Sequence, residues 1–474
     1  MEIALNLTRH EFLAGEDIDL QVSLRNSGTA PVEVPNPFHS TNWQPTYTVQ
    51  GPGYPSGVTF SFRSAVMKSA APQGDESSAV LIQLAPGEQT EEGVPLHQWV
   101  DLSVPGAYSV TARLRWRSID VSSAPVNLRI EQPSPVGAHF VRDQDESRAI
   151  WLQRRDRGTA LYNQVFSKLQ AVPGVVRTHV LAPIAEAGAD ATAPFSTAVR
   201  FTSAELMNSW VGYRDAAGLV ALGAGANPVK YPLHDQDRVV QDPFLLAGGE
   251  MDVPILRAGG LALVRFPKPG AGASPRELWS ATVREPPLEA AAAERIDRAG
   301  GRRIAFTSWA HGGLHLWLLD AASDKAMVTG PIRAGEARPL PGARPAVRIE
   351  PDGAVRAIVL YQRTTKRAGT STDLLVLFEA RFRPDGAPAG APTLTDLGDV
   401  PAAIAASAVA FLDSGDPIWA VQLTTGELWH SYAQQRLQKI PGTIVAPLEL
   451  LPRGPDAYVL VLPKQGAPTL YALR

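Results

Sequence analysis

The chain consists of short apolar runs that are interrupted by turn residues at short intervals. In the clearest stretch, residues 408–433, turns at 413–416 and 424–426 separate the apolar runs from one another. A turn roughly every eight to twelve residues is typical of antiparallel strands that follow one another as a meander. The pattern therefore predicts an all-β protein.

Versions of this meander recur through most of the chain. Between residues 137 and 474 there are about seven of them, spaced about 48 residues apart, with six or eight left open. Repeats of this length are typical of the blades of a β-propeller. We therefore expect a seven-bladed propeller whose last run, 470–473, is joined to a strand near 139–141. The paired runs are 149–153 with 160–165, 206–213 with 219–222, 261–266 with 278–283, 304–309 with 314–319, 355–361 with 374–378, 409–412 with 418–423, and 457–462 with 470–473.

The first quarter of the chain has a different pattern. Apolar residues alternate with polar ones at 3–7 and again at 18–24, which indicates strands with one buried face. These runs, the turn at 14–17 and a later strand at 125–130 resemble bacterial immunoglobulin-like domains. The resemblance implies a β-sandwich over residues 1–131.

Tyr108 adds to this resemblance. It follows Gly106 at the start of a long strand pattern. Immunoglobulin-like sandwiches often carry a tyrosine at this place, and its hydroxyl ties down the preceding loop. The antibody-type disulfide is absent because the chain contains no cysteine. The resemblance then implies ordinary core contacts from Val22 or Leu24 and from Val110.

The stretch 35–74 is rich in Pro, Gly, Ser and aromatic residues, which predicts long loops at one end of the sandwich. Its aromatic residues allow two interpretations. They form either an exposed contact surface or part of the sandwich core, and the second is favoured. They are Trp43, Tyr47, Tyr54 and Phe60.

Pro133 and Pro135 mark a boundary, because closely spaced prolines stiffen the chain and prevent strand pairing. The predicted order is an immunoglobulin-like β-sandwich, a Pro-rich linker and a β-propeller. Their ranges are 1–131, 132–136 and 137–474. A short helix is also expected at 287–298, where alanines are good helix formers and a following Gly-Gly pair would end it.

Composition and charge exclude several classes of function, although they add little to the predicted fold. The 474 residues carry a formal net charge of -3, which argues against a uniformly basic nucleic-acid binder. No apolar run approaches the roughly 18 residues needed to span a bilayer. The absence of cysteine excludes disulfides and thiolate metal sites.

The first residues lack the pattern of a signal peptide. We therefore expect synthesis in the cytoplasm, with export as part of a particle left open.

Candidate chemistry is sparse. His311 and His315 are separated by a Gly-Gly hairpin signal that places them on different strands, so no metal site is expected. The acidic clusters at 143–145 and 235–237 lack a full calcium-loop signature and are interpreted as solvated turns. No catalytic motif or nucleotide fingerprint occurs, so neither catalytic residues nor a cofactor are predicted. A pair of carboxylates suited to glycoside hydrolysis is left open, because in a propeller the two residues would come from different blades and the sequence cannot pair them.

A Leu-aromatic pair recurs just after turns, and a bulky ring at a fixed place in each blade fills the interface between neighbours. Packing is therefore the first interpretation of these rings. The stretch 428–432, Leu-Trp-His-Ser-Tyr, also resembles strands of sugar-binding propellers of the tectonin kind. This resemblance implies a ligand site between blades. Its candidate residues are Trp279, His315, Trp317, Trp429 and His430.

Three functions remain open at this stage. The leading hypothesis is a non-catalytic binding or structural protein, a subunit or accessory component of a larger bacterial or phage-like assembly, with other proteins as partners. The first alternative is a lectin-like propeller that binds a glycan. The second is a glycosidase or lyase with its site at the propeller mouth. Nucleic acid is not expected as a partner. The fold cannot choose among the three, because propellers host all of them.

Overall fold

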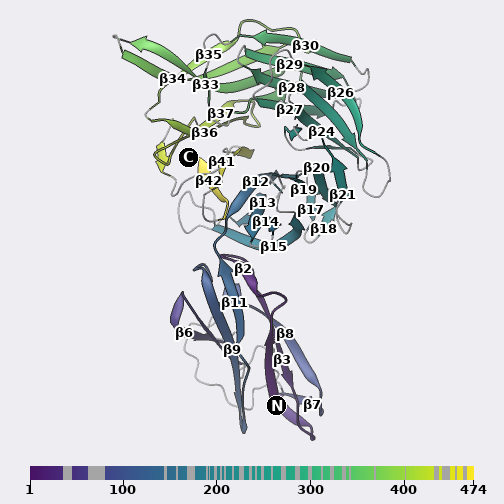
Figure 1. Ribbon diagram of the computed structural model, residues 1–474, viewed down its shortest axis with the longest axis vertical. Helices are drawn as coiled ribbons and strands as arrows, with labels where there is room; N and C mark the ends of the chain where they lie inside the picture. The colour runs from purple at the N-terminus through teal and green to yellow at the C-terminus, as the bar shows by residue number, and fades with distance from the viewer. Residues whose placement is uncertain are drawn as a thin grey trace. The chain divides into compact units, whose positions relative to one another are not determined.

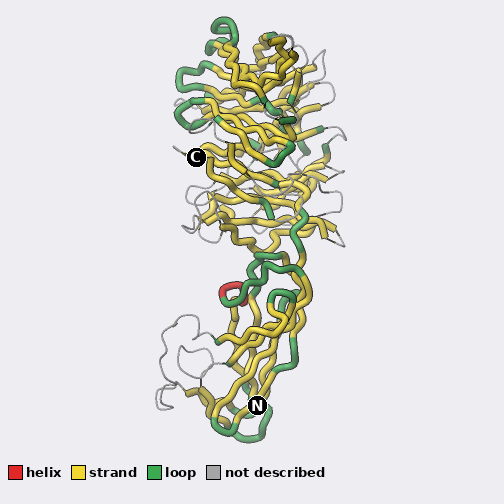
Figure 2. The backbone as a smooth tube through the Cα atoms, turned by 90° about the vertical axis from the view of Figure 1, so that its left-hand side faces the viewer, coloured by secondary structure: helices red, strands yellow, loops and turns green. Residues whose placement is uncertain are grey.

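The computed structural model describes most of the chain. Within the described residues the chain divides into two compact units, 1–133 with 179–182, and 134–178 with 183–474. Strands dominate both units, and the helical turn η2 (Leu96–Gln98) is drawn in red in Figure 2. The described residues are 1–35, 45–61, 81–142, 147–155, 158–167, 177–187, 191, 193–196, 200–202, 205–207, 210–215, 218–223, 229–233, 237–240, 243–246, 250–257, 260–267, 274–282, 289–296, 301–310, 313–320, 325–333, 338–340, 343–367, 370–400, 402–431, 437–439, 449–453, 456–462 and 467–473.

The first unit contains two main sheets (Figure 1). One has the order β1-β3-β8, and the other has the order β2-β11-β9-β5-β6, with β10 also paired to β9. Strand β2 runs parallel to β11, and β4 pairs with β7. The bounds are β1 (Glu2–Asn6), β2 (Glu11–Leu13), β3 (Asp19–Arg25), β4 (Val32–Pro35), β5 (Thr46–Gly51), β6 (Tyr54–Phe60), β7 (Leu81–Leu84), β8 (Gln89–Pro95), β9 (Gly106–Trp116), β10 (Ile119–Ser122) and β11 (Val126–Glu131).

Alternation along the strands builds the core of this unit. In β3, Leu20, Val22 and Leu24 are buried, while the residues between them are exposed or half-buried. Successive side chains of a strand point to opposite faces, so this pattern directs one face inward. Val22, Leu24 and Val110 belong to one apolar cluster, which confirms that ordinary core contacts occupy these positions.

Tyr108 ties the start of β9 to the loops beside it. Its hydroxyl donates a hydrogen bond to the carbonyl oxygen of Val104 at 2.8 Å and accepts one from the amide of Gly53 at 3.2 Å. The ring lies so close to Gly51 that a side chain at that position would overlap it. The predicted bond between Tyr108 and the preceding loop is confirmed.

The aromatic residues of the early loops pack inward where they are described. Tyr47 and Phe60 are buried and stack at a centroid distance of 5.4 Å, and Phe60 also stacks on Trp99. Tyr54 is half-buried against the same cluster. Core packing is thus the correct interpretation for Tyr47 and Phe60, whereas Trp43 lies outside the described residues.

In the second unit, the described strands form seven consecutive antiparallel sheets, apart from the separate pair β17-β18. We number the sheets in chain order: β12-β13-β14-β15, β16-β19-β20-β21, β22-β24-β25-β26 with β23, β27-β28-β29-β30, β31-β33-β34-β35 with β32, β36-β37-β38-β39, and β40-β41-β42.

The strand bounds of the first four sheets are β12 (Pro135–Arg142), β13 (Ser147–Arg155), β14 (Gly158–Ser167), β15 (Arg177–Ala187), β16 (Ala193–Ser196), β17 (Arg200–Thr202), β18 (Glu205–Met207), β19 (Trp210–Asp215), β20 (Gly218–Gly223), β21 (Val229–Pro232), β22 (Arg238–Val239), β23 (Phe244–Leu245), β24 (Met251–Arg257), β25 (Gly260–Phe266), β26 (Arg276–Thr282), β27 (Glu289–Ile296), β28 (Arg302–Ala310), β29 (Gly313–Asp320) and β30 (Lys325–Ile332). Those of the last three are β31 (Arg338–Pro339), β32 (Ala346–Ile349), β33 (Val355–Arg367), β34 (Thr370–Phe382), β35 (Thr393–Asp399), β36 (Ile404–Phe411), β37 (Pro417–Leu423), β38 (Glu427–His430), β39 (Leu437–Lys439), β40 (Glu449–Arg453), β41 (Asp456–Val461) and β42 (Thr469–Leu473).

These sheets pack on one another in a closed cycle. Apolar clusters join each sheet to the next, from the first to the seventh. A further cluster joins the seventh sheet to the first, where Ala149 packs with Tyr458, Leu460 and Leu470. Figure 1 shows the sheets following one another around a ring. Antiparallel sheets packed face to face around a cycle form a β-propeller. The predictions of an all-β chain and of a propeller are confirmed.

Burial on both faces explains the continuous apolar runs in the sequence. In β33, Ala357, Val359 and Tyr361 pack in the cluster shared with the fourth sheet, whereas Ile358 and Leu360 pack in the cluster shared with the sixth. A strand between two neighbours needs apolar residues on both sides, so alternation gives way to an unbroken run.

The predicted helix at 287–298 is wrong. Residues 289–296 form β27, which pairs with β28 along its whole length. Ala290, Ala291 and Ala292 are buried there. Helix propensity is a weak preference, and pairing with a neighbouring strand overrides it because the small alanine side chains fit a strand packed on both faces.

The predicted junction of 470–473 with the strand near 139–141 is one of packing, because Ala138 and Ala472 lie against the same apolar cluster within the described residues. Residues 139–141 lie in β12, which pairs with β13 of its own sheet. The first and seventh sheets meet through side chains instead. Besides the apolar cluster, Gln164 Nε2 donates a hydrogen bond to the carbonyl oxygen of Pro468 at 3.0 Å, and His139 Nδ1 lies 3.4 Å from Glu449 Oε1.

Candidate functional site

Two of the predicted ligand-binding residues lie between the third and fourth sheets. Trp317 is buried in the apolar cluster that joins these sheets, and Trp279 packs against that cluster while half-buried. The ring of Trp279 lies 5.2 Å from that of Phe306. Both tryptophans therefore contribute to the contact between the two sheets.

His315 lies beside Trp317 on β29. Its ring stacks on the Trp317 ring at a centroid distance of 5.7 Å and is half-buried. Its carbonyl oxygen accepts a hydrogen bond from Thr307 Oγ1 at 3.0 Å, within the same sheet. The structure thus brings Trp279, His315 and Trp317 to one region.

Trp429 and His430 lie elsewhere, on β38 of the sixth sheet. Trp429 packs edge-on against Trp419, with ring centroids 5.2 Å apart, in the cluster between the fifth and sixth sheets. His430 is fully buried. The structure does not gather the candidate residues into one site, and a ligand-binding role for them remains a prediction.

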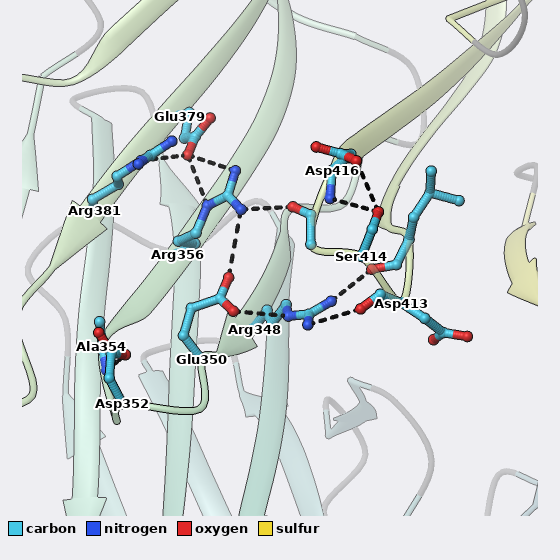
Figure 3. Close-up of polar contacts among 12 residues, drawn as sticks. Arg348, Glu350, Asp352, Ala354, Arg356, Glu379, Arg381, Asp413, Ser414 and Asp416 are labelled. Carbon is cyan, nitrogen blue, oxygen red and sulfur yellow. Dashed lines mark hydrogen bonds and ion pairs between the residues drawn. The ribbon is translucent and has the colours of Figure 1, made fainter. Parts of the chain in front are cut away.

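A group of charged residues that sequence reasoning missed lies beside the boundary between the fifth and sixth sheets (Figure 3). We call Arg348, Glu350, Arg356, Glu379 and Arg381 the charged seam. Glu379 Oε1 accepts hydrogen bonds from Arg356 Nε and from Arg381 Nε, both at 2.8 Å. Glu350 lies 3.4 Å from Arg356 and 3.3 Å from Arg348 through its two carboxylate oxygens.

The charged seam also reaches the turn between β36 and β37 in the sixth sheet. Arg356 Nη1 donates to the carbonyl oxygen of Gly415 at 2.6 Å. Arg348 donates to the carbonyl oxygens of Leu412 and Asp413 at 2.6 Å and 3.1 Å. Figure 3 shows both guanidinium groups directed at this turn. Two arginines of one sheet therefore satisfy backbone acceptors of the next.

The turn is shaped to present these carbonyl groups. Gly415 adopts φ of 92°, a left-handed conformation that favours glycine. Its amide bonds to the carbonyl oxygen of Leu412 at 2.9 Å. The turns at 350–354 and 383–387 have the same bonding pattern and a left-handed glycine at the same place. Arg303 of the fourth sheet reaches the carbonyl oxygen of Pro384 at 3.4 Å. An arginine of one sheet thus contacts a turn of the next at two boundaries.

A second charged group connects the third and fourth sheets. Asp252 on β24 is fully buried and accepts two hydrogen bonds from Arg265, at 2.7 Å and 3.0 Å. It is also paired with Arg302 of the fourth sheet. Hydrogen bonding to Asp252 raises the pKa of Arg265 above its usual value, although burial opposes the shift. A buried charge needs such partners, because an unpaired one would be strongly destabilising.

Asp237 corrects the interpretation of the cluster 235–237 as a solvated turn. It is buried, and its Oδ1 lies 3.2 Å from Arg257 Nε. Arg257 also pairs with Glu277 at 2.5 Å. The other residues of that cluster, and those at 143–145, lie outside the described residues.

These arrangements define what the carboxylates can do. Acid–base cleavage of a glycosidic bond needs two carboxylates that face each other across the bond. Asp252 and Glu379 instead face arginines.

Among the described residues, no group of three or more potential metal ligands is close enough to hold an ion, and His311 lies outside those residues. In the same part of the chain, no helix has the length and apolar character needed to cross a membrane.

A sequence signal for the charged seam does exist. Pro-Asp-Gly occurs at 351–353 and again at 384–386, with charged residues just before each turn in strands that are otherwise apolar. A charge at an inward position of a blade indicates a partner on the next blade. The identity of that partner cannot be inferred locally, because Arg356 and Gly415 are 59 residues apart.

Comparisons with known proteins do not identify a family. No family model matches the chain, and no curated protein is significantly similar to it in sequence. Solved structures do show similarity. BBS1N, crystallised in complex with ARL6DN, is 16% identical, with a TM-score of 0.40 over 73% of this chain and 94% of that chain.

Two bacterial proteins are similar at the same level. BamB from Moraxella catarrhalis is 11% identical, with a TM-score of 0.37 over 71% of this chain and 96% of its own. Virginiamycin B lyase from Staphylococcus aureus, crystallised with quinupristin, is 11% identical, with a TM-score of 0.37 over 77% of this chain and 99% of its own. At these values, no activity or partner transfers from these proteins to this chain.

Proposed function

We propose that this chain is a non-catalytic binding or structural protein, a subunit or accessory component of a larger bacterial or phage-like protein assembly. The observation that supports this proposal most is that the buried charged and aromatic side chains contact one another within the propeller. Asp252 and Glu379 are each held by two arginines, and Trp317 and Trp429 are buried between sheets. Asp252 links the third sheet to Arg302 of the fourth, and the two tryptophans fill the contacts between sheets, which suits a rigid framework for protein partners.

We further propose that the first unit is an immunoglobulin-like sandwich over residues 1–131, followed by a linker at 132–136. Its strand order supports this. The sheet β1-β3-β8 lies in the same unit as a sheet containing β11-β9-β5-β6, and β2 joins β11 in parallel. The bond from Tyr108 to Val104, four residues upstream, has the geometry of a tyrosine corner.

We also propose that the propeller over residues 137–474 has seven blades. The support is the cycle of seven sheets within the described residues. Those sheets contain between three and five strands each, close to the four strands typical of a blade.

The assembly proposal is tested by isolating the native complex. The chain with an affinity tag is purified from its own cells, and its mass is measured by size-exclusion chromatography with light scattering. We expect a particle larger than the 50.7 kDa chain that contains another protein in fixed stoichiometry. A second tagged protein from the same cells serves as the control. A strict monomer without a stoichiometric partner would contradict the proposal.

A glycan-binding function is the second candidate, and one observation favours it. Trp279 is half-buried and His315 is half-buried beside Trp317, so part of this aromatic group reaches the surface. Aromatic faces are common platforms for sugars. A glycan array with the wild type and Trp279→Ala tests this idea. Binding that the variant loses, while its circular dichroism is unchanged, would support it. No binding by the wild type would remove it.

A further inference from the structure

The hairpin of β33 and β34 is longer than its own sheet. Both strands have 13 residues. They pair along their whole length, from Val355 opposite Phe382 to Arg367 opposite Thr370. The strands on either side are shorter. Figure 1 shows the end of this hairpin extending beyond its neighbours at the upper left.

Among the described residues, the flanking strands pair with only part of the hairpin. On one side, the described residues of β31 pair as far as Gln362. On the other, β35 pairs as far as Leu374, and Val400 adds one bond to the carbonyl oxygen of Asp373 at 3.3 Å. We call the paired residues 363–367 and 370–373 the ribbon. Within the described residues it has no third strand. Its five residues on β33 extend about 17 Å at roughly 3.3 Å per residue.

The apolar core stops where the ribbon begins. Tyr361 and Leu374 are buried, whereas Thr364 and Asp373 are exposed. Cross-strand polar contacts continue into the ribbon, with Thr364 Oγ1 bonded to Asp373 Oδ1 at 2.7 Å and Thr365 Oγ1 3.3 Å from Thr372 Oγ1. Such pairs contribute little, and a two-stranded ribbon by itself is only marginally stable in water. The ribbon would gain stability from a further strand.

The ribbon has the properties of a template for such a strand. The edge of a two-stranded ribbon carries backbone donors and acceptors that a further strand can pair with. The described part contains several threonines, which favour strands, and no proline. Extended segments commonly bind at such edges through main-chain hydrogen bonds.

Charge determines which strand would bind. Residues 363–373 contain three basic residues and one acidic residue. Arg363 is paired with Asp396 at 2.9 Å. A second copy of the ribbon would bring like charges together and is disfavoured, whereas an acidic segment is attracted.

We propose that the ribbon is the docking element for an acidic extended segment of a partner protein, which adds as a strand to one edge of the ribbon. This inference rests on the proposed function, because it requires a protein partner. It adds the place of contact and the chemistry of the partner segment.

The first experiment uses a defined probe. A fluorescent peptide of alternating Thr and Glu, about ten residues long, is titrated with the full chain, and anisotropy is measured. The same peptide with Lys in place of Glu is the probe control. We expect binding of the acidic peptide alone, weakened by added salt. Hydrogen exchange at residues 363–373 should slow when the acidic peptide is bound.

Variants test the place of binding. Lys366→Glu with Arg367→Glu should weaken binding by about tenfold or more, because it reverses two of the three positive charges of residues 363–373 that attract the probe. The matched control is Arg333→Glu with Arg383→Glu, two exposed arginines outside the ribbon, which should bind as the wild type does. In a shortened variant, Asn-Gly replaces residues 364–373, a pair that favours a tight hairpin turn. It should lose binding while its thermal melting is unchanged.

Several results would overturn the inference. These are no binding of the acidic peptide, equal binding of both peptides, or full binding by the shortened variant. Isolation of the native complex distinguishes a failure of this inference from a failure of the proposed function. If the wild type and the shortened variant enter that complex equally, the ribbon is not the docking element, yet the assembly proposal stands. If the wild type enters no complex, the assembly proposal itself fails.

Discussion

Arg356 on the fifth sheet donates a hydrogen bond to the carbonyl oxygen of Gly415 on the sixth, with an N–O distance of 2.6 Å. The same guanidinium bonds to Glu379 at 2.8 Å and lies 5.1 Å from the centre of the Phe411 ring. Its side chain is 16% exposed, so water cannot easily replace these contacts. One residue therefore joins a hairpin to the turn of the next blade.

Arg356→Met should lower the free energy of unfolding by about 2 kcal/mol, because Glu379 keeps only the exposed Arg381 as a charged donor and the carbonyl oxygen of Gly415 loses the Arg356 guanidinium in a largely buried place. Arg381→Met is the matched control. Arg381 bonds to the same carboxylate oxygen at 2.8 Å, but its side chain is 62% exposed. It should cost less than about 0.5 kcal/mol. Urea denaturation measures both, and equal losses would contradict this account of the charged seam.

Gly415→Ala should destabilise the propeller by about 1–2 kcal/mol, because a side chain disfavours the left-handed conformation at this turn. The φ of 92° is the reason, since an added Cβ would meet its nearest atoms only at ordinary contact distance. Gly390→Ala is the control, with open space around the added carbon. Thermal melting of both variants gives the comparison. An unchanged melting temperature for Gly415→Ala would show that the turn relaxes without cost.

Trp429→Ala should cost about 3–5 kcal/mol, because it removes a ring packed between two sheets and leaves a cavity against Trp419. Trp279→Ala should cost less, since that ring is half-buried. Chemical denaturation of both variants checks the order. A small effect of Trp429→Ala would contradict packing as the main role of the recurring aromatic residue.

Tyr108→Phe should lower the stability of the first unit by about 1–2 kcal/mol, because the carbonyl of Val104 and the amide of Gly53 both lose a partner. Tyr54→Phe is the control. Its hydroxyl accepts one exposed hydrogen bond, from the amide of Asp101, and its loss should cost about 0.5 kcal/mol or less. The two variants are compared by urea denaturation, and a reversed order would contradict the role of Tyr108.

Stability should fall in alkaline solution. Burial raises the pKa of Tyr231, Tyr361 and Tyr471 above the ordinary value, and burial together with nearby Glu92 does so for Tyr47. A raised pKa means that the folded state holds protons that the unfolded state releases above about pH 10. The contribution of these protonated tyrosines to the free energy of unfolding is therefore fully present below about pH 10, and it is lost as the pH rises through their pKa values in the folded state.

The alkaline prediction is measured by urea denaturation at several pH values, together with the absorbance of tyrosinate. Tyr47→Phe provides the control within the first unit, where it should reduce the loss of stability above about pH 10. A stability that stays constant while the tyrosines ionise in the folded protein would contradict the prediction.

Much of the fold could be predicted, whereas most of the candidate site could not. The hairpins of β28 with β29 and of β33 with β34 match predicted runs, because turn residues and apolar stretches are local signals. The charged seam depends on which side chains meet across two sheets. Its members are separated in the chain, and a single arginine or glutamate in a strand does not reveal its partner.

The sequence by itself determined that the chain is built of antiparallel meanders and that a propeller follows from their repetition. Turn residues and apolar runs act over a few positions, so they can be interpreted without the rest of the chain. Only the tertiary structure decided that 289–296 is a strand, that the ring closes through side chains, and that Arg356 meets Gly415. These outcomes depend on contacts between distant segments, and such contacts outweigh local preference wherever a side chain is buried between two sheets.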